Sequence, residues 1–66
     1  MKNYQHQSQD ALLRERDQLL NDIAGWKETL KNVKSQLIVL YLNYAIGKAE
    51  EKIHAIDAEL LYREHN

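Results

Sequence analysis

Residues 37–46 read LIVLYLNYAI, an apolar run that only Asn43 interrupts. The run lies inside a longer block, residues 35–47, that contains no charged residue. A membrane-spanning helix needs about 20 apolar residues, so this run is too short to be one. A helix that faced solvent over the length of this block would normally carry charge. We therefore expect the block to be buried on most sides, at the centre of a dimer or as the surface that binds a partner.

Towards the N-terminus, the apolar residues follow a heptad spacing. Steps of four and three residues alternate over Leu12, Arg16, Leu19, Ile23, Trp26, Leu30, Val33, Leu37, Leu40 and Tyr44. Such a seam is typical of a helix that packs against another helix. Arg16 is its one polar member, and two interpretations of it stay open. Either its guanidinium reaches solvent beyond a packed stem, or it sets the register of a dimer by pairing with Glu15, Asp17 or Asp22 of a second chain.

Towards the C-terminus, the apolar spacing changes phase. A second seam comprises Leu42, Ile46, Ala49, Ile53, Ile56 and Leu60. The two phases cannot share one face of a straight helix, so the chain must turn or bend between them. We predict a break within residues 41–47, because Gly47 is the residue there that is suited to a positive φ.

Two other arrangements of this region stay open. A turn at residues 31–36, where Asn32 and Ser35 weaken a helix, would give two helices of similar length. Residues 37–46 could instead form a strand, since alternate residues of this run are apolar and several favour strands. A lone strand needs a pairing partner. This helix–strand–helix alternative therefore requires a dimer in which the strand pairs across the two chains.

The composition of the chain favours an all-α fold. Its 66 residues include two Gly, no Pro and no Cys. Gly and Pro mark turns, so the many turns of an all-β domain are not encoded, and without Cys there are no disulfides. We expect a flexible N-terminal tail over residues 1–7 and a single helical interaction domain over residues 8–66, with Ser8 as the N-cap of its first helix. Near the C-terminus, Glu59 and Arg63 have the spacing of an i,i+4 ion pair.

Large apolar side chains are numerous for so short a chain, with ten Leu, five Ile and one Trp. A two-helix hairpin has no enclosed core, and below roughly 70–80 residues a single core rarely supplies more than about 3–5 kcal/mol. We therefore predict that two hairpins associate as a homodimeric four-helix bundle. The predicted dimer or partner interface comprises Leu19, Ile23, Trp26, Leu30, Val33, Leu37, Leu40, Tyr41, Tyr44, Ile46, Ile53, Ile56 and Leu60.

Basic residues gather in one part of the chain, although the formal net charge is only -1. Lys27, Lys31 and Lys34 are four and three residues apart, which places them on one face of the predicted helix. Such a strip could contact phosphates, and binding of that kind weakens steeply with salt. These lysines are the candidate nucleic-acid strip, whereas the near-neutral balance of charge favours a protein as the partner.

The sequence contains no residue pattern that favours an enzyme. Glu51 and His54 match the Glu-x-x-His spacing of di-metal helical bundles. The first seam supplies no facing carboxylate, so we expect a solvated helix face with no metal, cofactor or small-molecule substrate. The two Gly are too far apart to form a phosphate-binding loop. The polar N-terminus lacks the apolar core of a secretory signal, and we expect a cytoplasmic protein without a membrane span.

In length and heptad pattern, the chain resembles the Rop-type plasmid hairpins, which dimerise into a four-helix bundle and bind paired RNA loops. The resemblance covers those two features and implies an RNA-binding helical hairpin as one alternative function. From the residues themselves we expect a small non-enzymatic homodimeric protein–protein interaction module. Small single-module chains of this kind are frequent among bacterial and phage accessory regulators, and on that general ground we expect a regulator that binds another protein. A structural subunit or assembly chaperone of a hetero-coiled coil is the other alternative.

Overall fold

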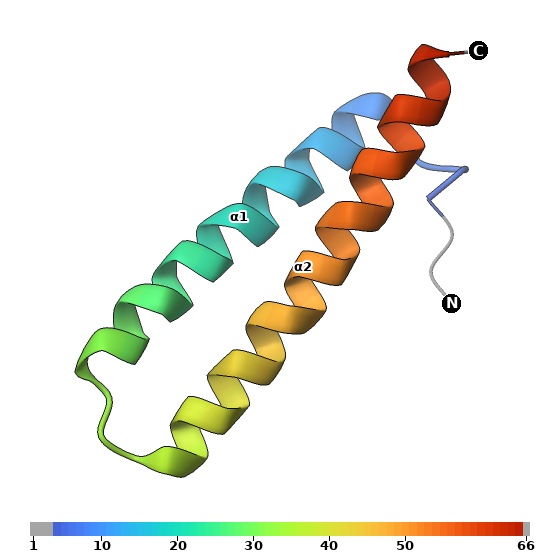
Figure 1. Ribbon diagram of the computed structural model, residues 1–66. Coiled ribbons are helices and arrows are strands. Elements are labelled where there is room, and N and C mark those ends of the chain that lie inside the picture. Colours follow the sequence, from blue (N-terminus) through green and yellow to red (C-terminus); the bar gives the residue numbers. More distant parts are fainter. Residues whose placement is uncertain (1–3, 66) are drawn as a thin grey trace.

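Two long helices lie side by side and are joined by a short loop in the computed structural model, which describes residues 4–65 (Figure 1). Helix α1 spans Gln9–Asn32 and helix α2 spans Gln36–Glu64. The hairpin is a rod with extents of 47 × 20 × 16 Å. The predicted all-α hairpin is confirmed, and within residues 4–65 no strand is present.

Helix α1 begins at a side-chain cap, as the sequence predicted. Ser8 has extended dihedrals, with φ of -68° and ψ of 160°, and its Oγ accepts a hydrogen bond of 3.1 Å from the backbone N–H of Ala11. Asp10 lies in the first turn, where its negative charge faces the positive end of the helix dipole. The N-cap therefore fixes the point at which the N-terminal segment gives way to helix.

The chain reverses direction between the two helices at residues 33–35, so the predicted break at 41–47 is wrong. Val33 and Ser35 at the two ends of this loop both have extended dihedrals, with φ of -84° and -79°. Such a loop needs no positive φ, and none of the residues that the structure describes has one. The turn therefore requires no Gly. Gly47, on which the prediction of a break at 41–47 was based, lies inside α2.

Of the two alternatives, the turn at 31–36 agrees with the structure and the strand over 37–46 does not. Residues 37–46 lie entirely within α2. Their alternating pattern arises because this part of the helix is apolar on two sides. Leu42 and Ile46 are buried against α1, whereas Leu40 and Tyr44 are exposed.

The core lies between α1 and α2 and consists of two clusters. At the open end of the hairpin, Tyr4 packs with Leu12 and Ile56, both of which are 0% exposed. Nearer the loop, the second cluster centres on Ile23 of α1 and Ile46 of α2. The half-buried side chains that complete the two clusters are Leu19, Trp26, Leu30, Ile53 and Leu60. The second seam of the sequence is thus the face of α2 that packs on α1.

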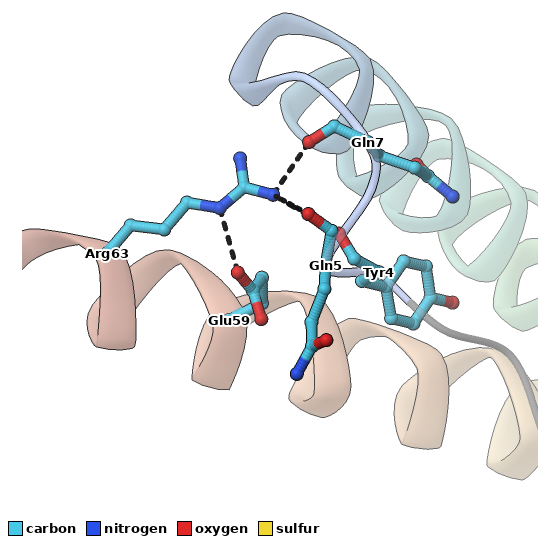
Figure 2. A network of polar contacts seen from close by, with 5 residues as sticks. All are labelled: Tyr4, Gln5, Gln7, Glu59 and Arg63. Carbon is cyan, nitrogen blue, oxygen red and sulfur yellow. Dashed lines mark hydrogen bonds and ion pairs between the residues drawn. The ribbon is translucent and has the colours of Figure 1, made fainter.

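Arg63 joins the N-terminal segment to the end of α2 (Figure 2). Its Nε donates a hydrogen bond of 2.8 Å to Glu59, which confirms the expected i,i+4 pair. Its Nη2 donates, at 3.2, 3.4 and 2.6 Å, to the backbone carbonyl oxygens of Tyr4, Gln5 and Gln7. A single guanidinium thereby satisfies backbone acceptors that no helix or strand would pair.

The segment before Ser8 also packs against the hairpin. Tyr4 is only 7% exposed, and its hydroxyl donates to Glu15 of α1 at 3.4 Å. The flexible tail was expected over residues 1–7. Residues 1–3 lie outside the described residues, and Tyr4, Gln5 and Gln7 make the contacts given above.

Candidate interaction surface

Four strongly exposed apolar side chains gather on the first half of α2. Their spacing of i, i+3, i+4 and i+7 places them on one face of the helix. This face points away from α1, since Leu42 and Ile46 on the other side of the helix are buried. The four side chains, which we call the outer patch, are Leu37 (79% exposed), Leu40 (66%), Tyr41 (68%) and Tyr44 (64%).

The outer patch is unusual for a protein surface because it lies in a block without charge, residues 35–47. Its two Leu and two Tyr side chains present roughly 500 Å² of exposed area, taking about 200 Å² for a full Tyr. A patch of this size on a single chain is often functional. Tyr is enriched at interfaces because its ring buries apolar area while its hydroxyl can stay wet. The outer patch is therefore the candidate interaction surface.

Two charged residues mark the end of the outer patch on the side away from the loop. The Nζ of Lys48 lies 5.7 Å from the centre of the Tyr44 ring, within the range of a cation–π contact. The same Nζ lies 3.9 Å from Oε1 of Glu51, one turn further along α2. A negative and a positive charge thus follow the apolar residues on the same face of the helix.

The structure divides the predicted interface residues into two groups. The outer patch is exposed, and Val33 is half-buried at the end of α1. The others pack between α1 and α2 within one chain, and they are Leu19, Ile23, Trp26, Leu30, Ile46, Ile53, Ile56 and Leu60. Because these side chains already contact one another in the hairpin, the outer patch is the large accessible part of the predicted interface.

The three lysines of the candidate nucleic-acid strip do not share one helix face. Lys27 and Lys31 lie on α1, but the helix ends at Asn32, so Lys34 belongs to the loop. Lys31 also forms an ion pair of 3.3 Å with Glu28. The structure therefore offers an exposed pair of lysines with a neighbouring carboxylate, which is a weak arrangement for binding phosphates.

Arg16 pairs within its own chain. Its Nε lies 2.6 Å from Oδ1 of Asp57 on α2, and both side chains are partly exposed. Within the single chain, the partner of Arg16 is therefore Asp57, and the predicted pairing with Glu15, Asp17 or Asp22 of a second chain stays a prediction. The ion pair joins α1 to α2.

The Glu-x-x-His pair lies on the exposed side of α2. Glu51 and His54 are both exposed, and within residues 4–65 no three His, Asp or Glu side chains are grouped as a metal site would need. His54 contributes to a shallow hollow between the helices, which is lined by Leu20, Ile23, Lys27, Glu50, Ile53 and His54. His54 thus shares this hollow with two charged residues, Lys27 and Glu50.

A second hollow, which the sequence analysis missed, lies where the N-terminal segment meets the second half of α2. It is lined by Tyr4, Gln5, Ala55, Ala58, Glu59 and Tyr62. Ala55 and Ala58 contribute the small side chains of this lining, and Tyr62 contributes a large ring. A sequence signal for it existed, because the spacing of four and three residues continues from Tyr44 through these alanines to Tyr62.

Comparisons of the chain with protein families, with curated proteins and with solved structures found no match. Across residues 4–65, neither helix combines the length and the apolar character that crossing a bilayer requires. The outer patch on the first half of α2 and the two hollows are therefore the surface features from which a function can be proposed.

Proposed function

We propose that this chain is a small, non-enzymatic interaction module that forms a homodimer and acts, as a cytoplasmic accessory regulator, by binding another protein. The observation that carries the proposal is the outer patch. Leu37, Leu40, Tyr41 and Tyr44 stand 64–79% exposed on one face of α2, in a block without charge. An apolar helix face of this kind is suited to packing against another helix.

Burial of the outer patch is the main favourable contribution to the free energy of association through this face. Full burial of one Leu or comparable side chain contributes about 1.5–3 kcal/mol, and two copies of the outer patch bring eight such side chains, each about two-thirds exposed. Their burial would contribute on the order of 10 kcal/mol. That magnitude is comparable with the roughly 4–15 kcal/mol that association costs in lost freedom. Association through the outer patch alone is therefore expected to be weak and reversible.

The limited core of the single hairpin supports the same proposal. Only two side chains, Leu12 and Ile56, are completely buried among the described residues. A two-helix hairpin exposes the outer side of each helix to solvent, and chains of this size commonly need association to gain stability. A homodimer that covers the outer patch would supply burial that one chain lacks.

Light scattering on size-separated protein tests the proposal with a matched pair of variants. Leu40→Glu places a charge in the outer patch and is expected to shift the chain from dimer to monomer while its helical circular dichroism is retained. Leu13→Glu is the control, because Leu13 is an exposed Leu of α1 outside the patch (42% exposed). A Leu40→Glu chain that remains as dimeric as the control would contradict the proposal. A wild-type chain that associates only with a different protein would instead favour a subunit of a hetero-coiled coil.

A further inference from the structure

The outer patch is one half of a longer seam along α2. From Leu37, steps of four and three residues continue without interruption to the end of the helix, and every position is exposed. We call this row the outer seam, and it comprises Leu37, Tyr41, Tyr44, Lys48, Glu51, Ala55, Ala58 and Tyr62. This is the heptad spacing with which one helix packs against another along its length. It lies on the side of α2 opposite the buried seam that contacts α1.

The side chains of the outer seam differ in size between its two halves. Near the loop they are large, with Tyr41 and Tyr44 projecting 68% and 64% exposed. Beyond Glu51, two small side chains, Ala55 and Ala58, precede the large ring of Tyr62, and all three line the hollow beside the N-terminal segment. One half of the helix face thus carries projecting rings, and the other half carries a depression.

These two halves are complementary to each other when a second copy is placed antiparallel. With the two-fold axis between Lys48 and Glu51, Lys48 of each copy lies opposite Glu51 of the other. In the same register, Tyr44 lies opposite Ala55 and Tyr41 opposite Ala58. Each Tyr ring can then enter the hollow of the other copy, and unlike charges meet at the centre of the interface.

A parallel arrangement of the same seam is unfavourable. It would place Lys48 against Lys48 and Glu51 against Glu51, so that like charges face each other at two successive layers. It would also place Tyr against Tyr and Ala against Ala, which crowds one half of the interface and leaves a void in the other. The charges and the sizes of the side chains thus both select the antiparallel orientation.

The area that the seam offers fits a specific dimer. The large side chains of the outer seam, together with Leu40 beside it, are each 64–79% exposed, and they are Leu37, Leu40, Tyr41, Tyr44 and Tyr62. Together they present roughly 600 Å² per copy when a full Tyr is taken as about 200 Å². Two copies therefore bring roughly 1,200 Å², at the lower end of the range for stable specific interfaces. The alanines and the stems of Lys48 and Glu51 add to this area.

We propose that the outer seam binds a second copy of this chain in antiparallel orientation, with Tyr41 and Tyr44 of each copy seated in the Ala55–Ala58 hollow of the other. The proposal rests on the homodimer of the proposed function and specifies its face, direction and register. The assembly is a four-helix arrangement in which the two α2 helices form the inner pair. The α1 helices lie outside and keep their exposed faces for a further partner.

Disulfide trapping tests the register, because the chain has no Cys of its own. Two variants, Tyr44→Cys and Ala55→Cys, are mixed and oxidised gently, and the products are resolved by mass. A disulfide needs Cα atoms within about 7 Å of each other. Position 44 meets position 55 of the other copy in the proposed register, whereas two copies of position 44 lie about 16 Å apart along the axis. We expect mixed dimers to exceed self-linked dimers at least tenfold. Tyr41→Cys with Ala58→Cys is a second pair that should behave in the same way.

The controls separate failure of the register from failure of dimerisation. Ala24→Cys, at an exposed position of α1, should form no preferred disulfide with Tyr44→Cys. Preferential self-linkage of Tyr44→Cys would indicate a parallel dimer and would overturn the register while leaving self-association intact. A wild-type dimer in which neither Cys pair forms mixed disulfides would overturn the outer seam as its interface. A wild-type chain that is monomeric by light scattering at all concentrations would overturn both proposals.

Discussion

The continuity of α2 through Gly47 predicts the sign of a stability change. Gly47 lies in the helix with no positive φ, and a Cβ added to it would meet no atom within 4 Å apart from its chain neighbours and the nearby backbone of its own helix. Gly in a helix interior is about 0.8–1.0 kcal/mol less favourable than Ala, chiefly through backbone entropy. Gly47→Ala should therefore raise the free energy of unfolding by about 0.8 kcal/mol. A gain of that size raises the melting temperature by roughly 3–6 °C in a domain this small.

The assay is urea and thermal unfolding followed by circular dichroism, at two protein concentrations because association would shift the midpoints. Gly25→Ala is a matched control, since Gly25 also lies in a helix with open space around its Cα. If the chain instead turned at residues 41–47 with Gly47 at positive φ, Ala there would cost about 1–2 kcal/mol. Destabilisation by Gly47→Ala, with stabilisation by Gly25→Ala, would refute a continuous α2.

Three further changes test the core, the Arg63 contacts and the outer seam. Ile56→Ala should lower the free energy of unfolding by about 2–5 kcal/mol, because Ile56 is 0% exposed. Urea unfolding measures this change, and a loss below about 1 kcal/mol would be inconsistent with a buried site. Arg63→Ala should lower the free energy of unfolding by about 1–2 kcal/mol. It should also speed amide hydrogen exchange at Gln7, whose N–H donates to the Tyr4 carbonyl at 3.2 Å. Unchanged exchange would show that Arg63 does not hold this segment. Lys48→Glu should weaken self-association about tenfold, and adding Glu51→Lys should restore it, as measured by light scattering. Equal affinity of the single and double variants would argue against a Lys48–Glu51 layer.

Much of the fold was encoded in local patterns that sequence alone can reveal. Ser8 is the N-cap because its hydroxyl can accept from the free N–H groups of the first turn. The pair of Glu59 and Arg63 forms because residues four apart are neighbours on a helix. Leu12 and Ile56 were placed on the two seams by spacing, and the α1 part of the first seam does pack against the second seam. These features depend on helix geometry only, so they can be predicted without knowledge of the turn.

The position of the turn could not be derived in the same way. The first seam appears continuous from Leu12 to Tyr44, although the chain reverses at residues 33–35. Leu37 and Tyr44 continue the heptad spacing by coincidence. They lie on α2, beyond the short loop, and they face outwards. Because Val33 and Ser35 are extended and none of the described residues has a positive φ, the turn needs no Gly to mark it. Asn32 and Ser35 were the only local signals, and they compete with the stronger expectation of a Gly at a turn.

The sequence identified only part of the candidate surface, and the reason is related. Spacing identifies which residues share a face, but it does not say whether that face meets the same chain or another one. Ile46 and Tyr44 both belong to the predicted interface, yet Ile46 packs on α1 and Tyr44 is exposed. The second half of the outer seam was overlooked because Ala55 and Ala58 contribute little hydrophobic signal. Their importance appears only when the hollow that they form is compared with the rings that could fill it.

Sedimentation equilibrium of the untagged chain, from micromolar to millimolar concentration, tests the central claim most directly. The claim is that the outer face of α2 binds a second copy of the chain. We expect a reversible monomer–dimer equilibrium whose upper limit is twice the chain mass of 7.8 kDa. A mass that stays at the value of a single chain across this range would contradict the claim and would mean that the exposed Tyr and Leu side chains of α2 serve a different partner.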